Sequence, residues 1–160
     1  KNDYHTAYMD LRSYTLFSKR YALALRLVGG GSGGKQPQNF ELNGYYGVRG
    51  YEGEEVGKNI ILASTELRVP FLDYLSLAFP IPLTITSIRG SVFADLGGVW
   101  DDTNQFRVIE NNRLRDMKLG FGLGPRMNIG FAVLKFDVAW LTDLANSSKP
   151  TFYLSLTEDF

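Results

Sequence analysis

The sequence contains no cysteine, which excludes disulfide bonds and thiolate metal sites. Its one histidine, His5, has no evident partner residues, so we expect neither a histidine-based catalytic group nor a zinc site. Lys and Arg number 17, as do Asp and Glu, and the formal net charge is zero. That balance argues against a surface that binds nucleic acid through bulk charge. We therefore expect a protein that is not an enzyme and that uses no cofactor.

A long hydrophobic run is also lacking, because no segment approaches the roughly 20 apolar residues that a membrane helix requires. Apolar and polar residues instead alternate with a period of two in seven segments, which predicts strands with two different faces. The segment VLKFDVAWL, for example, places Leu, Phe, Val and Trp on one face and Lys and Asp on the other. An eighth strand could lie within Leu72–Thr86, although Pro80 and Pro82 limit it to an edge, a bend or a long turn.

Alternation alone would also fit a soluble antiparallel sandwich with one wet face. Three details favour a transmembrane barrel instead. Charge scarcely interrupts the apolar face, the opposite face combines glycines with charges of both signs, and aromatic residues gather at the segment ends. A long polar loop follows Val99, as on the outer side of such barrels. We predict an all-β fold, an antiparallel transmembrane β-barrel that forms a single domain over residues 1–160.

Closure of this barrel has two solutions. Unpaired strand edges in lipid leave backbone groups unsatisfied, so the sheet must close. About eight strands is the practical minimum for a closed barrel filled by side chains. A count of seven or eight therefore allows a small self-closed barrel, or a homodimer in which two half-barrels pair edge to edge.

The motif VRGY (Val48–Tyr51), preceded by a glycine-rich strand and a P-x-x-F element, resembles the signature loop of the Omp85 superfamily. That superfamily includes the BamA, TamA and two-partner-secretion barrels. Further similar elements follow in order: STELRVP, VFADLGGVW, LGFGLGPR, LKFDVAW and the terminal strand that ends at Phe160. The resemblance extends from Tyr21 to Phe160 and corresponds to the C-terminal, surface-antigen-like half of the outer-membrane barrel. The usual barrel of the family has sixteen strands and follows periplasmic POTRA domains.

The resemblance implies that the loop folds back into the barrel and sets Arg49 against the lumen wall. Alternation independently places Glu66 and Asp95 on the lumen faces of the next two strands. An unpaired buried charge is costly, and a guanidinium suits two carboxylates at once. We therefore predict that Arg49 bonds to Asp95, with Glu66 as second partner; the alternative is an ordinary exposed loop arginine. The predicted structural lock comprises Val48, Arg49, Gly50, Tyr51, Glu66 and Asp95.

The resemblance also implies a function in the bacterial outer membrane, namely insertion, assembly or translocation of other outer-membrane proteins. The partners would be the lipid bilayer and client barrels, which in this family engage a weak seam between the first and last strands. Here the seam would involve the terminal strand, through Phe152, Leu154, Leu156 and Phe160. The alternative is a non-catalytic structural or anchoring barrel without insertase activity. A passive pore is less favoured, because side chains and the loop would fill so small a lumen.

Overall fold

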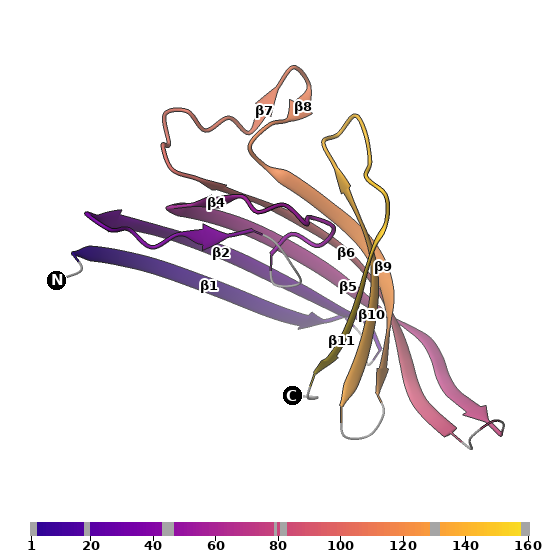
Figure 1. The fold of residues 1–160 in the computed structure, drawn as a ribbon. Helices are drawn as coiled ribbons and strands as arrows, with labels where there is room; N and C mark the ends of the chain where they lie inside the picture. The colour runs from indigo at the N-terminus through magenta and orange to yellow at the C-terminus, as the bar shows by residue number, and fades with distance from the viewer. Residues whose placement is uncertain are drawn as a thin grey trace.

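A computed structural model describes residues 3–17, 20–42, 47–78, 80, 83–128 and 132–157. These residues form β-structure and loops, and they include no helix that is long and apolar enough to cross a membrane. The main element is one antiparallel sheet of seven strands, drawn in Figure 1. In spatial order the strands are β1 (Tyr4–Leu16), β2 (Ala22–Gly34), β5 (Asn59–Leu77), β6 (Leu83–Trp100), β9 (Lys118–Asn128), β10 (Val133–Thr142) and β11 (Thr151–Thr157).

Two small hairpins lie outside this sheet. The first joins β3 (Phe40–Glu41) to β4 (Val56–Gly57) and lies over one face of the sheet (Figure 1). The second joins β7 (Ile109–Glu110) to β8 (Arg113–Leu114) within the long polar loop that follows β6. The glycine-rich segment before the first hairpin is strand, since β2 continues to Gly34.

The seven alternating segments of the sequence correspond to the seven strands of the main sheet, which confirms the all-β antiparallel prediction. The prospect of an eighth strand within Leu72–Thr86 was wrong. These residues extend β5 and β6 into a long hairpin, paired from Leu72 with Ile88 to Leu77 with Leu83. Pro80 lies in the connection, where the missing N–H breaks no ladder hydrogen bond. A register shift follows Pro70, as expected where a proline interrupts a ladder.

The sheet is curved and open (Figure 1). Within the described residues β1 pairs only with β2, and β11 pairs only with β10. The prediction of a self-closed barrel of about eight strands is therefore not met by this sheet. Seven strands fall short of the number that encloses a packed interior.

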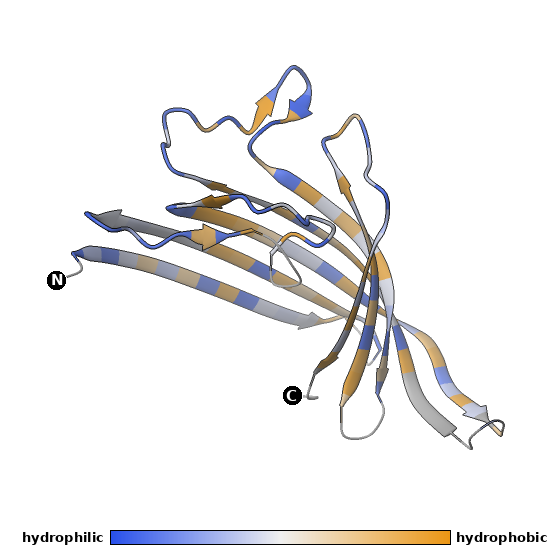
Figure 2. Ribbon diagram, in the orientation of Figure 1, coloured by the Kyte–Doolittle hydropathy of each residue, from blue (hydrophilic) through white to orange (hydrophobic). Residues whose placement is uncertain are grey.

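The two faces of the sheet differ in composition, and the alternating colours along the strands in Figure 2 show the period. The apolar face, which carries Leu67 and Val92, is solvent-exposed in the isolated chain. Its large exposed side chains also include Leu11, Leu25, Leu27, Leu123, Phe152, Leu154 and Leu156. The opposite, covered face carries Glu66 and Asp95 and lies under a segment of which residues 40–42 and 47–57 are described.

The hydrophobic core lies between the covered face and this segment, and not on the apolar face. It comprises Val28, Leu42, Val48, Tyr51, Ile60, Leu62 and Val99, with Phe40 and Leu141 packed against it. Burial of these side chains holds the segment on the sheet. The fold thus leaves its larger apolar surface outside and builds its core around the loop.

Candidate functional site

The loop Val48–Tyr51 forms a tight turn on the covered face. The Val48 amide donates to the Leu42 carbonyl at 3.0 Å, and the Tyr51 amide donates to the Val48 carbonyl at 3.1 Å. Val48 and Tyr51 are both buried in the core. Gly50 has a φ of +92°, a conformation that a residue with a side chain rarely adopts. The sequence V-R-G-Y therefore anchors both ends of the turn and leaves the arginine directed toward the sheet.

Arg49 meets both carboxylates that the sequence pattern suggested. Its Nε and Nη2 donate to the two oxygens of Asp95 at 2.7 and 3.0 Å, and its backbone amide donates to Oδ2 at 3.2 Å. Nη1 donates to Glu66 Oε2 at 3.0 Å. The Arg49 side chain is only 6 % exposed and that of Asp95 only 1 %. This planar, two-pronged contact is the strong form of an arginine–carboxylate interaction.

Phe93 supplies a further contact that the sequence did not reveal. The guanidinium carbon of Arg49 lies 3.5 Å from the centroid of the Phe93 ring. Phe93 is buried on β6 and pairs directly with Glu66 on β5. A cation over an aromatic face is attracted by the ring quadrupole. The available signal was an aromatic residue on an otherwise polar face, two positions before Asp95.

A second arginine extends the network. Arg126 on β9 donates through both terminal nitrogens to Asp137 on β10, with Nη2 3.1 Å from Oδ2. The same Nη2 donates to Glu66 Oε2 at 3.3 Å, and Arg68 Nε donates to Glu66 Oε1 at 2.9 Å. Glu66 therefore contacts three arginines and connects the loop to β9. We call Arg49, Glu66, Asp95, Arg126 and Asp137 the charge network.

Sequence reasoning missed Arg126 and Asp137 as members of this network. Alternation places the Arg126 and Asp137 side chains on the same face of the sheet. Their contact is diagonal, however, since Arg126 stands opposite Lys135 in the β9–β10 register. Diagonal neighbours on one face are within reach of a long side chain. Strand register, which alternation alone does not give, was the missing information.

Gly120 of β9 makes room for the loop, and Gly122 of the same strand makes room for the Phe93 ring. A Cβ atom at Gly120 would overlap the Arg49 carbonyl oxygen, and one at Gly122 would lie 2.5 Å from the Phe93 ring. The glycines of GFGLG thus alternate along a strand and relieve crowding on this face. Close approach of another backbone is a usual reason for glycine within a strand.

The predicted seam residues lie apart from the charge network. Phe152, Leu154 and Leu156 are exposed on the apolar face of β11, and Phe160 lies outside the described residues. The contact between β11 and the loop is made by Tyr153, whose hydroxyl oxygen accepts a hydrogen bond from the Gly50 amide at 2.9 Å.

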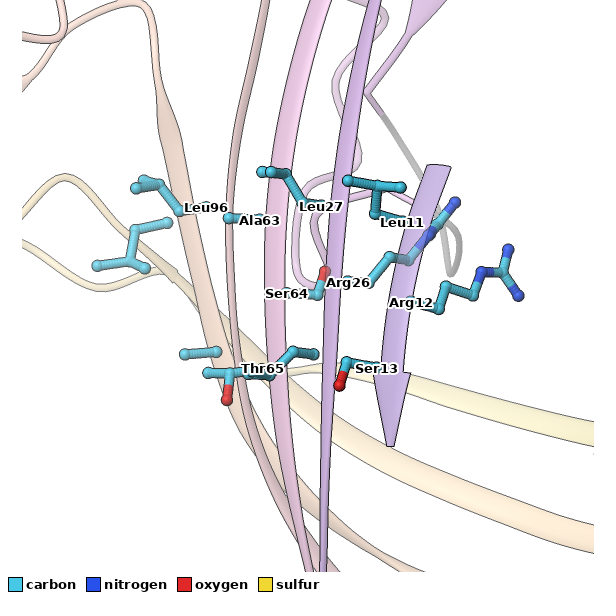
Figure 3. Close-up of a pocket in the computed structure, with 12 residues that line it drawn as sticks. Leu11, Arg12, Ser13, Arg26, Leu27, Ala63, Ser64, Thr65 and Leu96 are labelled. Atoms are coloured by element: carbon cyan, nitrogen blue, oxygen red, sulfur yellow. The ribbon is translucent and has the colours of Figure 1, made fainter. Parts of the chain in front are cut away.

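The apolar face contains a shallow hollow of about 460 Å³, shown in Figure 3. Leu11, Leu27, Ala63 and Leu96 form one cross-strand row there, since each stands opposite the next in the sheet register. In Figure 3 the short side chain of Ala63 lies between those of Leu27 and Leu96, and all three line the hollow. The exposed surface of the hollow is mostly apolar and suits hydrocarbon, although Arg12, Arg26 and Ser64 also line it. Across the described part of the chain, no group of three or more His, Cys, Asp or Glu side chains is placed to hold a metal ion.

Comparison with known proteins identifies the family. The family model described as the Omp85 superfamily domain matches residues 2–160. No curated protein and no solved structure matches the chain. The family match spans nearly the whole sequence, including the loop and both strands that supply its carboxylates. The chain belongs to the Omp85 superfamily.

Proposed function

We propose that this chain acts in the bacterial outer membrane as an Omp85-type barrel that assists insertion, assembly or translocation of other outer-membrane proteins. The observation that carries the proposal is the docked loop, in which Arg49 makes four hydrogen bonds to Asp95 and Glu66. Membership of the superfamily supports the same function, and the matched residues include the loop.

The apolar face supports a membrane location. Large hydrophobic side chains such as Leu123 and Leu154 are more than half exposed in the isolated chain. A contiguous apolar surface of this kind marks an interaction site, and lipid is the partner that fits a face with period-two alternation. The charge network lies on the opposite face, where it would be shielded from the acyl chains.

The open edges support completion by further strands. Backbone groups along the free edges of β1 and β11 would have no partner in hydrocarbon. We propose that these edges pair in the membrane, with a second copy of the chain as the partner that would give a barrel of about twice the strand number. The charge network and the loop would then lie in the lumen of that barrel. The mass of the detergent-solubilised protein, by light scattering with detergent accounted for, distinguishes a dimer from a monomer.

The loop would serve this barrel as a structural lock. Removing one partner of a buried ion pair commonly costs about 3–5 kcal/mol, because it leaves an uncompensated charge. Arg49 therefore resists leaving the covered face unless its carboxylates are neutralised or solvated. A loop held in this way fixes the relative positions of β5 and β6.

The test is an insertion assay with the protein reconstituted in bilayer vesicles. A urea-unfolded outer-membrane barrel is added, and its folding is followed by resistance to protease over time. We expect faster folding than in empty vesicles, and loss of most of that gain in Arg49→Ala. Arg115→Ala, which removes an exposed arginine from the long polar loop, is the matched control and should act like wild type. No acceleration by the wild-type protein would refute the insertion function.

A second candidate is a structural or anchoring barrel without insertase activity. The contacts of Glu66 with three arginines favour it, since they tie β5, β9 and the loop into one rigid unit. If the protein is an anchor, the wild-type chain should integrate into the membrane and be stable there, but it should not accelerate folding of the added barrel in the insertion assay.

A further inference from the structure

We propose that Tyr153 is a positioning residue that couples docking of the Val48–Tyr51 loop to the pairing of the edge strand β11. The importance of this coupling for client insertion rests on the proposed function. The coupling itself depends only on contacts within the chain.

Strand β11 is held by few contacts. Among the residues that the structure describes, it pairs with β10 over seven residues, whereas the other edge strand, β1, pairs with β2 over thirteen. Three of the side chains of β11, Phe152, Leu154 and Leu156, point away from the covered face and are largely exposed. Any additional attachment on the covered face therefore has a large share in keeping β11 paired.

The loop provides that attachment at its tip. Gly50 lies directly over the β10 backbone, where an added Cβ atom would come within 3.0 Å of the Trp140 carbonyl carbon and 3.1 Å of the Leu141 nitrogen. In this position the Gly50 amide donates to the hydroxyl oxygen of Tyr153, on the neighbouring strand β11, at 2.9 Å. Only a residue without a side chain brings the turn this close, so glycine is needed both for the φ of +92° and for the contact.

Tyr153 also stands beside the charge network. It is directly opposite Asp137 in the β10–β11 register, and Asp137 binds Arg126 and lies 3.6 Å from Arg49 Nη1. Movement of β11 away from β10 would therefore leave the Gly50 amide without its acceptor, and would open the network to water on one side. A buried amide that loses its acceptor is unfavourable, so the loop and the strand stabilise each other. Such coupling is reciprocal, and release of either should loosen the other.

Amide hydrogen exchange tests the coupling in the protein reconstituted in bilayer vesicles. In Tyr153→Phe we expect exchange of the Gly50 amide to rise about tenfold, the size of one lost hydrogen bond. The amides of β11 that bond to β10 should also exchange faster. Ser155→Ala is the matched control, because it removes a hydroxyl from the same face of β11 that has no hydrogen-bond partner among the described residues. It should leave both sets of amides unchanged.

A substitution in the loop tests the coupling in the opposite direction. Gly50→Ala strains the turn and brings a methyl group against the Trp140 backbone. We expect it to speed amide exchange in β11, although no residue of that strand is substituted. Adding Tyr153→Phe to it should then have little further effect, because the shared contact is already lost. Unchanged β11 exchange in both single variants would overturn the proposal. Because no client is present, this result is independent of the insertion assay, and either proposal can fail while the other stands.

Discussion

Neutralising Asp95 is the sharpest test of how the loop is held. In Asp95→Asn the side chain keeps its volume, so no cavity forms, but Arg49 loses the charge that it contacts through two guanidinium nitrogens and its backbone amide. Breaking a buried ion pair by removing one charge costs about 3–5 kcal/mol. We expect about 3 kcal/mol here, the low end, because the amide oxygen still accepts a hydrogen bond and Glu66 remains.

The assay is urea unfolding in vesicles, followed by the fluorescence of the two tryptophans. With a denaturant dependence of about 2 kcal/mol per molar urea, the midpoint should fall by about 1.5 M. Trypsin supplies a local readout, since it cleaves after arginine and the Arg49 side chain is buried in the docked loop. Cleavage between Arg49 and Gly50 should be slow in the wild type and fast in Asp95→Asn.

A double variant separates the ion pair from the loop contacts around it. Replacing both members, as in Arg49→Met with Asp95→Leu, leaves no uncompensated charge and should cost less than Asp95→Asn alone. Asp102→Asn, in the exposed loop after β6, controls for a general effect of removing a carboxylate. An Asp95→Asn protein with wild-type midpoint and wild-type resistance at Arg49 would refute the reasoning.

Two further predictions concern the surroundings of the loop. Gly120→Ala should displace the loop, because the new methyl group overlaps its backbone, and overpacking should lower the free energy of unfolding by about 1–3 kcal/mol. Gly90→Ala is the control, because the atom nearest to its added methyl group is 3.4 Å away. Equal urea midpoints for the two variants would contradict the prediction. In the β10–β11 loop, backbone amides of Asn146 and Ala145 lower the pKa of Asp143, so its ionised form is the stabilising one. Proteolysis of this loop should therefore quicken as the pH falls below the usual aspartate value, and Asp143→Asn should remove the pH dependence; an unchanged profile in that variant would exclude Asp143 as the cause.

The strands, and the two carboxylates that bind Arg49, could be predicted from the sequence because both depend on alternation. A period of two assigns each side chain to a face without any knowledge of pairing, so Glu66 and Asp95 fell on one face from position alone. The same rule predicted Leu154 on the apolar face, where it lies. The face on which each side chain lies could therefore be predicted from the sequence.

Contacts that depend on register were not readable. Arg126 meets Asp137 diagonally, and Tyr153 meets Gly50 across 103 residues of sequence, so neither pair is near in position or fixed by a shared period. The end of β5 was misjudged for a related reason, because Pro80 signalled a break but not whether the strands on either side pair with each other. Closure of the barrel is the hardest property to predict, since alternation within a strand does not indicate which strand pairs with the edge strands of the sheet.

The different compositions of the two faces explain why ion pairs hold the Val48–Tyr51 loop. If the apolar face meets lipid, most large hydrophobic side chains of the strands are unavailable to hold a loop. The covered face keeps only a small core near Leu62 and Val99, which anchors Val48 and Tyr51 at the ends of the turn. Between these anchors the loop is held mainly by the charge-assisted hydrogen bonds of Arg49, with the Phe93 ring and the Tyr153 hydroxyl as further contacts. Because such bonds require both partners in place, the loop docks in one position, and β5, β6, β9 and β11 must be assembled around it before that position exists.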